Sequence, residues 1–196
     1  MLPDLEQALF EGAAVARRGH FRYESGHHGD LWLDLDALLV DARAVQDWAA
    51  ALAQQVAAWR PEVVCGPLVG GAFVAQALAA ATGADFAFAE RRLIEGNAGY
   101  HIPDGLRARL PGRRVVLADD AVNAGSALLA TLEDVRRCGA EVAGFASLIT
   151  LGDAAATLAA RHRLPFAHLA RLERSVWPAQ ACPLCAKGVP LQDLVA

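Results

Sequence analysis

Short apolar runs alternate with helix-like segments from residue 62 to residue 169, and this alternation constrains the fold more than any other feature. The apolar runs predict strands at residues 62–65, 86–89, 114–118, 141–149 and 166–169. The segments around them predict helices at residues 42–59, 71–82, 126–137 and 153–162. Continuously apolar strands are typical of a parallel sheet covered on both faces. The pattern therefore predicts one α/β domain, a twisted parallel sheet of about five strands with helices on both faces.

The two ends of the chain lie outside this alternation. Residues 5–17 carry apolar side chains at helical spacing and end in a charged turn before Gly19, which predicts a helix. Residues 31–36 alternate between apolar and polar side chains, as in a half-buried strand. We expect the ends to form a small hood over the carboxyl ends of the core strands, with the boundaries 1–36 and 170–196 for the hood and 37–169 for the core.

The segment from Val115 to Ala127 carries the strongest functional signal. Its apolar run ends in Asp119 and Asp120, and a loop of small residues then opens into a predicted helix. Such a loop can bring backbone N–H groups and a helix N-terminus onto a phosphate. The carboxylates would repel that phosphate, but they suit the hydroxyls of a phosphorylated ribose or a magnesium ion carried by the ligand. The alternative is an ordinary turn between strand and helix with an acidic cap.

This segment resembles the phosphoribosyl-pyrophosphate (PRPP) motif of the type I phosphoribosyltransferases, with Asn123 and Ser126 where Thr is usual. The resemblance implies PRPP contacts from Asp119, Asp120, Ala121, Val122, Asn123, Ala124, Gly125, Ser126 and Ala127. It also implies Mg²⁺ held near Asp119 and Asp120 through PRPP, and transfer of the phosphoribosyl group to a nitrogenous base with release of pyrophosphate. The family further implies a homodimer in which the loop around residues 92–101 reaches the neighbour's site.

A second glycine-rich turn follows the first predicted strand. Backbone amides freed by its glycines would hold a further anionic group. The resemblance implies that this turn binds pyrophosphate through Pro67, Leu68, Val69, Gly70 and Gly71. On its own evidence, a turn with a purely structural role is equally consistent with the sequence.

Two further segments, residues 21–34 and 182–191, resemble orotate phosphoribosyltransferases within the family. This likeness implies that the flat indole of Trp32 stacks on the base and that His27 and Asn123 contact it. The alternative is that Trp32 belongs to the core and that His27 and His28 are exposed loop residues.

The chain departs from the orotate enzymes in two places. The 25 or so residues between the second and third predicted strands read as the catalytic loop, but their usual lysines are missing, and the remaining cations are Arg91, Arg92 and His101. Leu151 stands where an arginine near the base carboxylate is usual, and Arg22 or His27 are candidates to replace it. A PRPP- or nucleotide-binding regulator, or an enzyme for another base, is therefore the alternative function.

Charge and hydropathy exclude some partners. The net charge of −4 gives no basic field for nucleic acid, and no apolar run reaches the length of a membrane span. The first residues, with Asp4, Glu6 and Glu11, do not read as a signal peptide, so we expect a cytoplasmic protein.

Four cysteines raise the questions of a disulfide or a zinc site. We expect Cys65 and Cys138 to be small buried hydrophobes. Cys182 and Cys185 have the spacing of a zinc knuckle, but no second ligand pair lies nearby in the sequence, and His162 and His168 would reach them only by chance of folding. The paired histidines 27 and 28 likewise lack ligand partners at suitable spacing. We expect residues 182–191 to form a structural turn of the hood.

Overall fold

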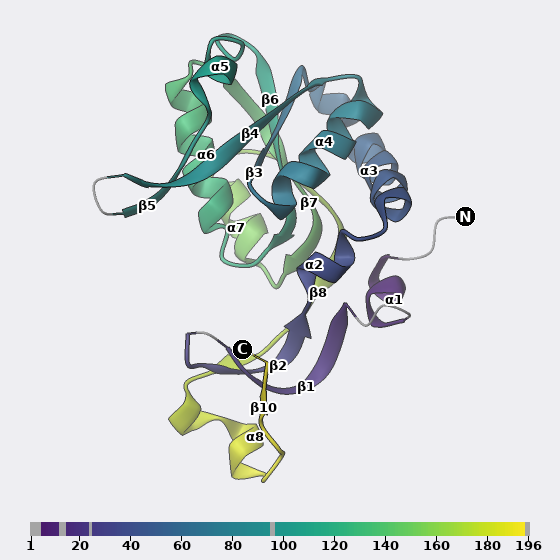
Figure 1. Cartoon of the computed structure of the whole chain (residues 1–196), viewed down its shortest axis with the longest axis vertical. Helices are drawn as coiled ribbons and strands as arrows, with labels where there is room; N and C mark the ends of the chain where they lie inside the picture. Colours follow the sequence, from purple (N-terminus) through teal and green to yellow (C-terminus); the bar gives the residue numbers. More distant parts are fainter. Residues whose placement is uncertain (1–4, 12–14, 24, 95–96, 195–196) are drawn as a thin grey trace.

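The computed structural model describes residues 5–11, 15–23, 25–94 and 97–194. Its elements form two units, a large core and a smaller hood beneath it in the view of Figure 1. The hood combines purple strands from the start of the chain with yellow segments from its end (Figure 1). No helix in the described parts of the chain is long and apolar enough to cross a membrane.

The core contains a six-stranded sheet in the order β5-β4-β3-β6-β7-β8. Its strands are β3 Val63–Pro67, β4 Asp85–Ile94, β5 Asn97–His101, β6 Arg114–Val122, β7 Glu141–Leu151 and β8 Phe166–Leu172. All neighbouring pairs are parallel except β4 and β5, which are antiparallel. The α/β class and the five predicted strands are confirmed, and β5 is an edge strand that the sequence analysis did not predict.

Helices cover both faces of this sheet (Figure 1). They are α3 Ala42–Val56, α4 Gly70–Thr82, α6 Ser126–Arg137 and α7 Ala154–His162. Alternate residues of β6 pack into two hydrophobic clusters on opposite faces of the sheet. Val116 packs on the face covered by α3 and α4, and Val115 packs on the face covered by α6 and α7. All of β6 from Val115 to Leu117 is fully buried, which explains its continuously apolar sequence. The predicted helix at 42–59 is α3 followed by the 3-10 turn η1, Ala57–Trp59.

The hood is built around a four-stranded sheet in the order β10-β1-β2-β9. Its elements are β1 Ala16–Arg22, β2 His28–Leu33, β9 Val176–Trp177, η2 Ala179–Ala181, α8 Pro183–Ala186 and β10 Gln192–Asp193. β1 pairs with β2 from its own end of the chain and with β10 from the other. The prediction that the two ends form one unit therefore matches the structure, although β8 carries residues 170–172 into the core sheet.

Two local predictions were wrong. The helix predicted at 5–17 is α1, Leu5–Phe10, and the charged turn before Gly19 belongs instead to β1, where Arg17 pairs with Trp32. Long-range strand pairing here overrides the local helical pattern. The strand predicted at 31–36 ends at Leu33 and gives way to α2, Leu35–Leu38, because the Asp34 side chain accepts a hydrogen bond from the Ala37 N–H at 3.0 Å and caps that helix.

A further difference concerns the interval of about 25 residues that was predicted to be the catalytic loop. It contains the β4–β5 hairpin, which extends away from the body of the core (Figure 1), and the short helix α5, Asp104–Arg107. Residues 95 and 96 at its turn lie outside the described residues.

Candidate active site

Asp119 and Asp120 stand at the carboxyl edge of the core sheet. β6 continues past them to Val122 rather than ending at Ala118 as predicted, but its pairing with β3 stops at Leu117. Beyond that point β6 pairs only with β7, so one side of the strand is open at the level of the two carboxylates. Both aspartates are buried, with 7% and 9% of their surface exposed.

The electrostatics of this pair call for a ligand that brings positive charge or hydroxyl donors. Burial raises the pKa of Asp119 well above its usual value, and the neighbouring Asp120 raises it further. Burial also raises the pKa of Asp120, and Asp36 on α2 adds negative charge near it. No basic side chain in the described structure compensates the pair, whose hydrogen bonds come from backbone N–H groups of Asp120 at 3.1 Å and Ala121 at 2.7 Å. A divalent cation or a sugar diol therefore fits this site.

The glycine-rich turn between β3 and α4 lies directly against the two carboxylates. A Cβ atom added at Gly71 would come within 2.5 Å of Asp119 Oδ1, and one added at Gly70 would collide with Asp120 Oδ2. The turn contains a cis peptide bond between Leu68 and Val69. The structure thus brings together the segments predicted to bind pyrophosphate and PRPP, with the N-terminus of α4 opening at the same point.

The predicted phosphate loop joins β6 to α6. Gly125 has φ of 78°, a left-handed conformation that favours glycine, and α6 begins at the next residue. Four backbone N–H groups at the start of an α-helix have no partner within the helix, which suits phosphate binding. Ala124, Gly125 and Ser126 line a hollow of about 400 Å³. Val122 points into the core, so it can contact PRPP only through its backbone.

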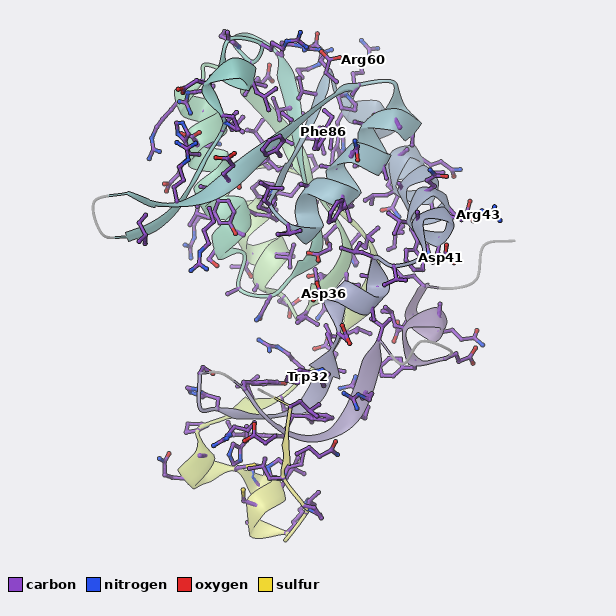
Figure 2. The ribbon with its side chains drawn as sticks, viewed as in Figure 1. Trp32, Asp36, Asp41, Arg43, Arg60 and Phe86 are labelled. Atoms are coloured by element: carbon purple, nitrogen blue, oxygen red, sulfur yellow. The ribbon has the colours of Figure 1, made fainter. Side chains whose placement is uncertain are left out.

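A second cavity, of about 200 Å³, lies where hood and core meet. The hood contributes Tyr23, Leu31, Trp32, Leu33 and Arg174, and the core side contributes Leu35, Ala121, Asn123 and Leu151. Figure 2 labels Trp32 in the part of the hood nearest the core. Trp32 and Asn123, both predicted to contact the base, thus line the same cavity.

Arg174 is the one basic residue that lines this cavity, and the sequence analysis did not single it out. Its guanidinium group hydrogen-bonds to Asn123 Oδ1 and lies over the Tyr23 ring, 5.9 Å from the centroid. The two residues proposed as substitutes for the missing arginine lie elsewhere. Arg22 forms an ion pair with Asp193, and exposed His27 does not line the cavity, so the base-contact prediction for His27 has no support here. Arg174 lies just after the last core strand, so no local pattern in the sequence indicated that it would line this cavity.

The β4–β5 hairpin separates the predicted catalytic cations. Arg91 is paired across the hairpin with Tyr100. Burial and the charge of Asp119 raise the pKa of Tyr100, and Arg91 opposes that rise, which brings this pair of residues into the electrostatic field of the carboxylates. Arg92 is exposed and forms an ion pair with Glu90 at 2.8 Å.

His101 faces the other side of the hairpin. Its ring nitrogens lie 3.5 Å from Asp104 and 3.8 Å from buried Asp134 on α6. Asp134 also accepts hydrogen bonds from the Ile102 N–H at 2.8 Å and from Arg107 at 2.5 Å. The geometry therefore places His101 at the anchor of the hairpin, on the face opposite to Tyr100, because strand neighbours point to opposite faces, and its catalytic role stays a prediction.

The comparison with known protein families decides the classification. The family described as "Phosphoribosyl transferase domain" matches residues 34–164. The chain belongs to this family. It is 29% identical to an orotate phosphoribosyltransferase of Caldanaerobacter subterraneus, over 93% of this chain and 92% of the relative. It is 30% identical to the orotate phosphoribosyltransferase of a Nitratiruptor species, over 94% of each. These relatives place it among the type I phosphoribosyltransferases, nearest in kind to the orotate enzymes.

Solved structures show the same fold. The orotate phosphoribosyltransferase from Aeropyrum pernix has a TM-score of 0.68 at 24% identity, covering 86% of this chain and 93% of that one. The adenine phosphoribosyltransferase from Thermoanaerobacter pseudethanolicus has a TM-score of 0.59 at 21% identity, covering 72% and 88%. The fold is thus shared by phosphoribosyltransferases of different bases, so the base must be argued from the site.

Proposed function

We propose that this protein is an orotate phosphoribosyltransferase of de novo pyrimidine synthesis, which converts orotate and PRPP to orotidine 5′-monophosphate and pyrophosphate. The observation that carries the proposal is the cavity in which Trp32, Asn123 and Arg174 meet beside the carboxyl edge of β6. The curated relatives that match nearly the whole chain bear the same name.

PRPP would lie along the carboxyl edge of the core sheet. Asp119 and Asp120 would hold the ribose hydroxyls, the loop at 121–127 the 5′-phosphate, and the turn at 67–71 the pyrophosphate. Mg²⁺, bound through PRPP near the two carboxylates, would neutralise phosphate charge and polarise the bond to the leaving group. The buried, uncompensated charge of the pair supports this assignment.

Orotate would occupy the cavity between hood and core. Trp32 offers a flat face to the pyrimidine, and Arg174 offers a cation to its carboxylate, which otherwise costs free energy to bury. In the reaction, the ring nitrogen of orotate forms a bond to C1 of the ribose and loses its proton. The bond from C1 to the pyrophosphate oxygen breaks, and its electron pair leaves with pyrophosphate.

Arg91 is the hairpin residue best placed to contact the leaving group. It lies across from Tyr100, whose pKa responds to Asp119, so the two strands approach the carboxylates from the core side. A guanidinium can clamp phosphate oxygens through two parallel hydrogen bonds, which makes arginine an adequate replacement for a lysine at this point.

A different base, or a regulatory role, is the second candidate. The observation that favours it is the absence of lysine from the hairpin, where Arg91 and Arg92 are the basic residues. We also infer a cytoplasmic location, since the four cysteines are free thiols, as is usual in a reducing compartment.

The deciding experiment follows the absorbance of orotate in the presence of PRPP and Mg²⁺, with uracil, hypoxanthine and adenine in parallel. We expect orotate to be consumed and pyrophosphate to be released. Turnover of another base but not orotate would give the first alternative. No turnover of any base, with PRPP still bound in calorimetric titration, would give the regulatory one. Binding of PRPP by the double variant Asp119→Asn, Asp120→Asn would reject the assignment of the carboxylates.

A further inference from the structure

Four side chains that are typical zinc ligands converge in the hood. His20 lies on β1 and His28 on β2, whereas Cys182 precedes α8 and Cys185 lies within it. One ligand atom from each residue lies within 4.8 Å of every other. His20, His28 and Cys182 are buried, with exposed fractions of 0%, 6% and 3%. Folding therefore places two histidines, which are distant in sequence, next to the two cysteines and supplies the second ligand pair.

The separations between these ligand atoms are close to the edges of a tetrahedral metal site. His20 Nε2 lies 3.2 Å from His28 Nδ1 and 3.4 Å from Cys182 Sγ, and Cys185 Sγ lies 3.3 Å from His28 Nδ1. With Zn–N bonds of about 2.0–2.1 Å and Zn–S bonds of about 2.3 Å, a tetrahedron has N···N edges of about 3.4 Å and N···S edges of about 3.6 Å. Four of the six separations, including 3.7 Å between His20 Nε2 and Cys185 Sγ, are thus close to those of a tetrahedral site, and the other two are at most 4.8 Å.

Hydrogen bonds among these groups do not account for the arrangement. His20 Nδ1 lies 2.9 Å from the Val189 carbonyl oxygen, to which it can only donate. A neutral His20 then carries a lone pair at Nε2, and this atom faces His28 Nδ1, Cys182 Sγ and Cys185 Sγ, the last at 3.7 Å. One lone pair accepts one hydrogen bond, whereas a central cation interacts with all four groups. A metal-bound histidine commonly donates its other ring N–H to a backbone carbonyl, as His20 does to Val189.

We propose that His20, His28, Cys182 and Cys185 bind one zinc ion as a structural site. The ligand set is Cys₂His₂ with Cys-x-x-Cys spacing, and four protein ligands leave no open position for catalysis. Two thiolates and two neutral imidazoles favour zinc over magnesium or calcium, which prefer oxygen ligands. The site is separate from the carboxylates of the active site and does not depend on which base the protein accepts.

The zinc ion would hold the two ends of the chain together. The ligand pairs are separated by more than 150 residues in sequence, as the contacts of His28 and His20 with Cys185 show. The strand pairing that joins the ends is short, since β9 and β10 have two residues each. Small units with little apolar core commonly depend on a metal or a disulfide for stability. Zinc here would fix the hood that carries Trp32.

The test begins with the metal content of the full-length protein, purified under reducing conditions from zinc-supplemented cells and measured by mass spectrometry. We expect about one zinc ion per chain in the wild type and below about a tenth of that in Cys182→Ala and His20→Ala. Cys138→Ala and His162→Gln are matched controls, a buried thiol and an imidazole outside the cluster, and they should keep their zinc.

A second measurement covers the case in which ligand variants fail to fold. Wild-type protein stripped of zinc and reconstituted with Co²⁺ should show the intense visible bands of tetrahedral cobalt and a thiolate-to-cobalt charge-transfer band. His28→Cys should retain a metal ion and alter both bands. A strong chelator should lower the Tm of the wild type. Wild-type protein without zinc, cobalt bound without thiolate bands, or a native disulfide between Cys182 and Cys185 would each overturn the proposal.

Discussion

At the scale of single residues, the buried charges of Asp119 and Asp120 lower the stability of the folded protein. Burial and mutual repulsion raise the pKa of Asp119, so the folded state holds its proton more firmly than the unfolded chain does. The free energy of unfolding therefore falls as pH rises from the unfolded pKa of about 3.9 through the raised folded pKa, and the full cost persists above it. Such a cost is expected where the charge serves a ligand.

We predict that Asp119→Asn is more stable than the wild type at pH 8 and no more stable at pH 4, because a neutral amide removes the buried charge. In a chain of this size each 1 kcal/mol corresponds to about 2–4 °C in Tm, and we expect a rise of that order at pH 8. Calorimetric scans at the two pH values measure it, and PRPP titration should show binding lost. Asp47→Asn, at an exposed carboxylate on α3, serves as the control. A lower Tm for Asp119→Asn at pH 8 would contradict the argument.

Arg174 gives the second residue-scale prediction. Charge-assisted hydrogen bonds contribute about 1.5–3 kcal/mol, so Arg174→Gln should raise the KM for orotate roughly 10- to 100-fold and leave the KM for PRPP within about a factor of three. Steady-state kinetics with each substrate varied in turn separate the two effects. Arg22→Gln removes another hood arginine, one that pairs with Asp193 outside the cavity. If Arg22→Gln rather than Arg174→Gln raised the orotate KM, the structural assignment of the cation would be wrong.

At the scale of elements, the sequence predicted whatever depends on neighbours along the chain. The helix at 126–137 matches α6 to the residue, since its apolar spacing and the glycine before it are local signals. β1 and the β4–β5 hairpin were missed because both depend on strand partners that local spacing does not reveal. β1 pairs with the neighbouring β2 and with the distant β10, and β4 pairs with a second strand that follows a charged stretch.

The residues of the candidate site also divide into those that local sequence predicts and those that depend on distant partners. The carboxylates and both glycine-rich turns could be predicted as site residues because each is a continuous segment beside a strand end. The role of Arg174 and the histidine partners of Cys182 and Cys185 were not predicted, because each of these residues reaches its partners only after folding brings distant segments together.

The turn between β3 and α4 yields an element-scale prediction. In Gly70→Ala, the new methyl group would collide with the Asp120 carboxylate and displace it, so we expect PRPP affinity to fall at least about tenfold. The helix itself should tolerate alanine, whose helix propensity exceeds that of glycine. Gly105→Ala is a matched control in α5, where an added Cβ meets nothing within 4 Å. Calorimetry with PRPP and a thermal scan separate binding from folding. Unchanged affinity in Gly70→Ala would show that the turn and Asp120 do not act together.

At the scale of the whole molecule, the hood completes the cavity that we propose binds the base. The core alone provides the carboxylates and the two glycine-rich turns, whereas Trp32 and Arg174 come from segments at opposite ends of the chain. Hydrogen bonds join the two ends of the chain to each other. Arg18 donates to the Glu173 carbonyl at 2.7 Å, and the Ser175 N–H donates to Asp30 at 2.8 Å. On the proposed function, selection of the base is thus a property of the assembled chain.

The surface of the core carries an exposed apolar strip. A hollow of about 610 Å³ between α3 and α4 is lined without any charged side chain and contains Phe73, which is 53% exposed. Val69, one turn earlier on the same face, is 67% exposed and belongs to the turn beside Asp120. We propose a homodimer that covers this apolar strip, so that the partner would lie close to the pyrophosphate turn.

Light scattering on the wild type should then give twice the chain mass of 20.7 kDa at micromolar concentration. In Phe73→Glu a charge replaces the aromatic ring at the proposed interface, and burying an unpaired carboxylate costs several kcal/mol, so we expect the monomer to dominate. Val176→Glu, at an exposed apolar residue of the hood, should remain dimeric. If the hairpin around residues 92–101 completes the neighbour's site, turnover per chain in Phe73→Glu should fall with the dimer fraction, and raising the protein concentration should restore it. A monomeric wild type, or a Phe73→Glu variant that stays dimeric, would place the partner surface elsewhere.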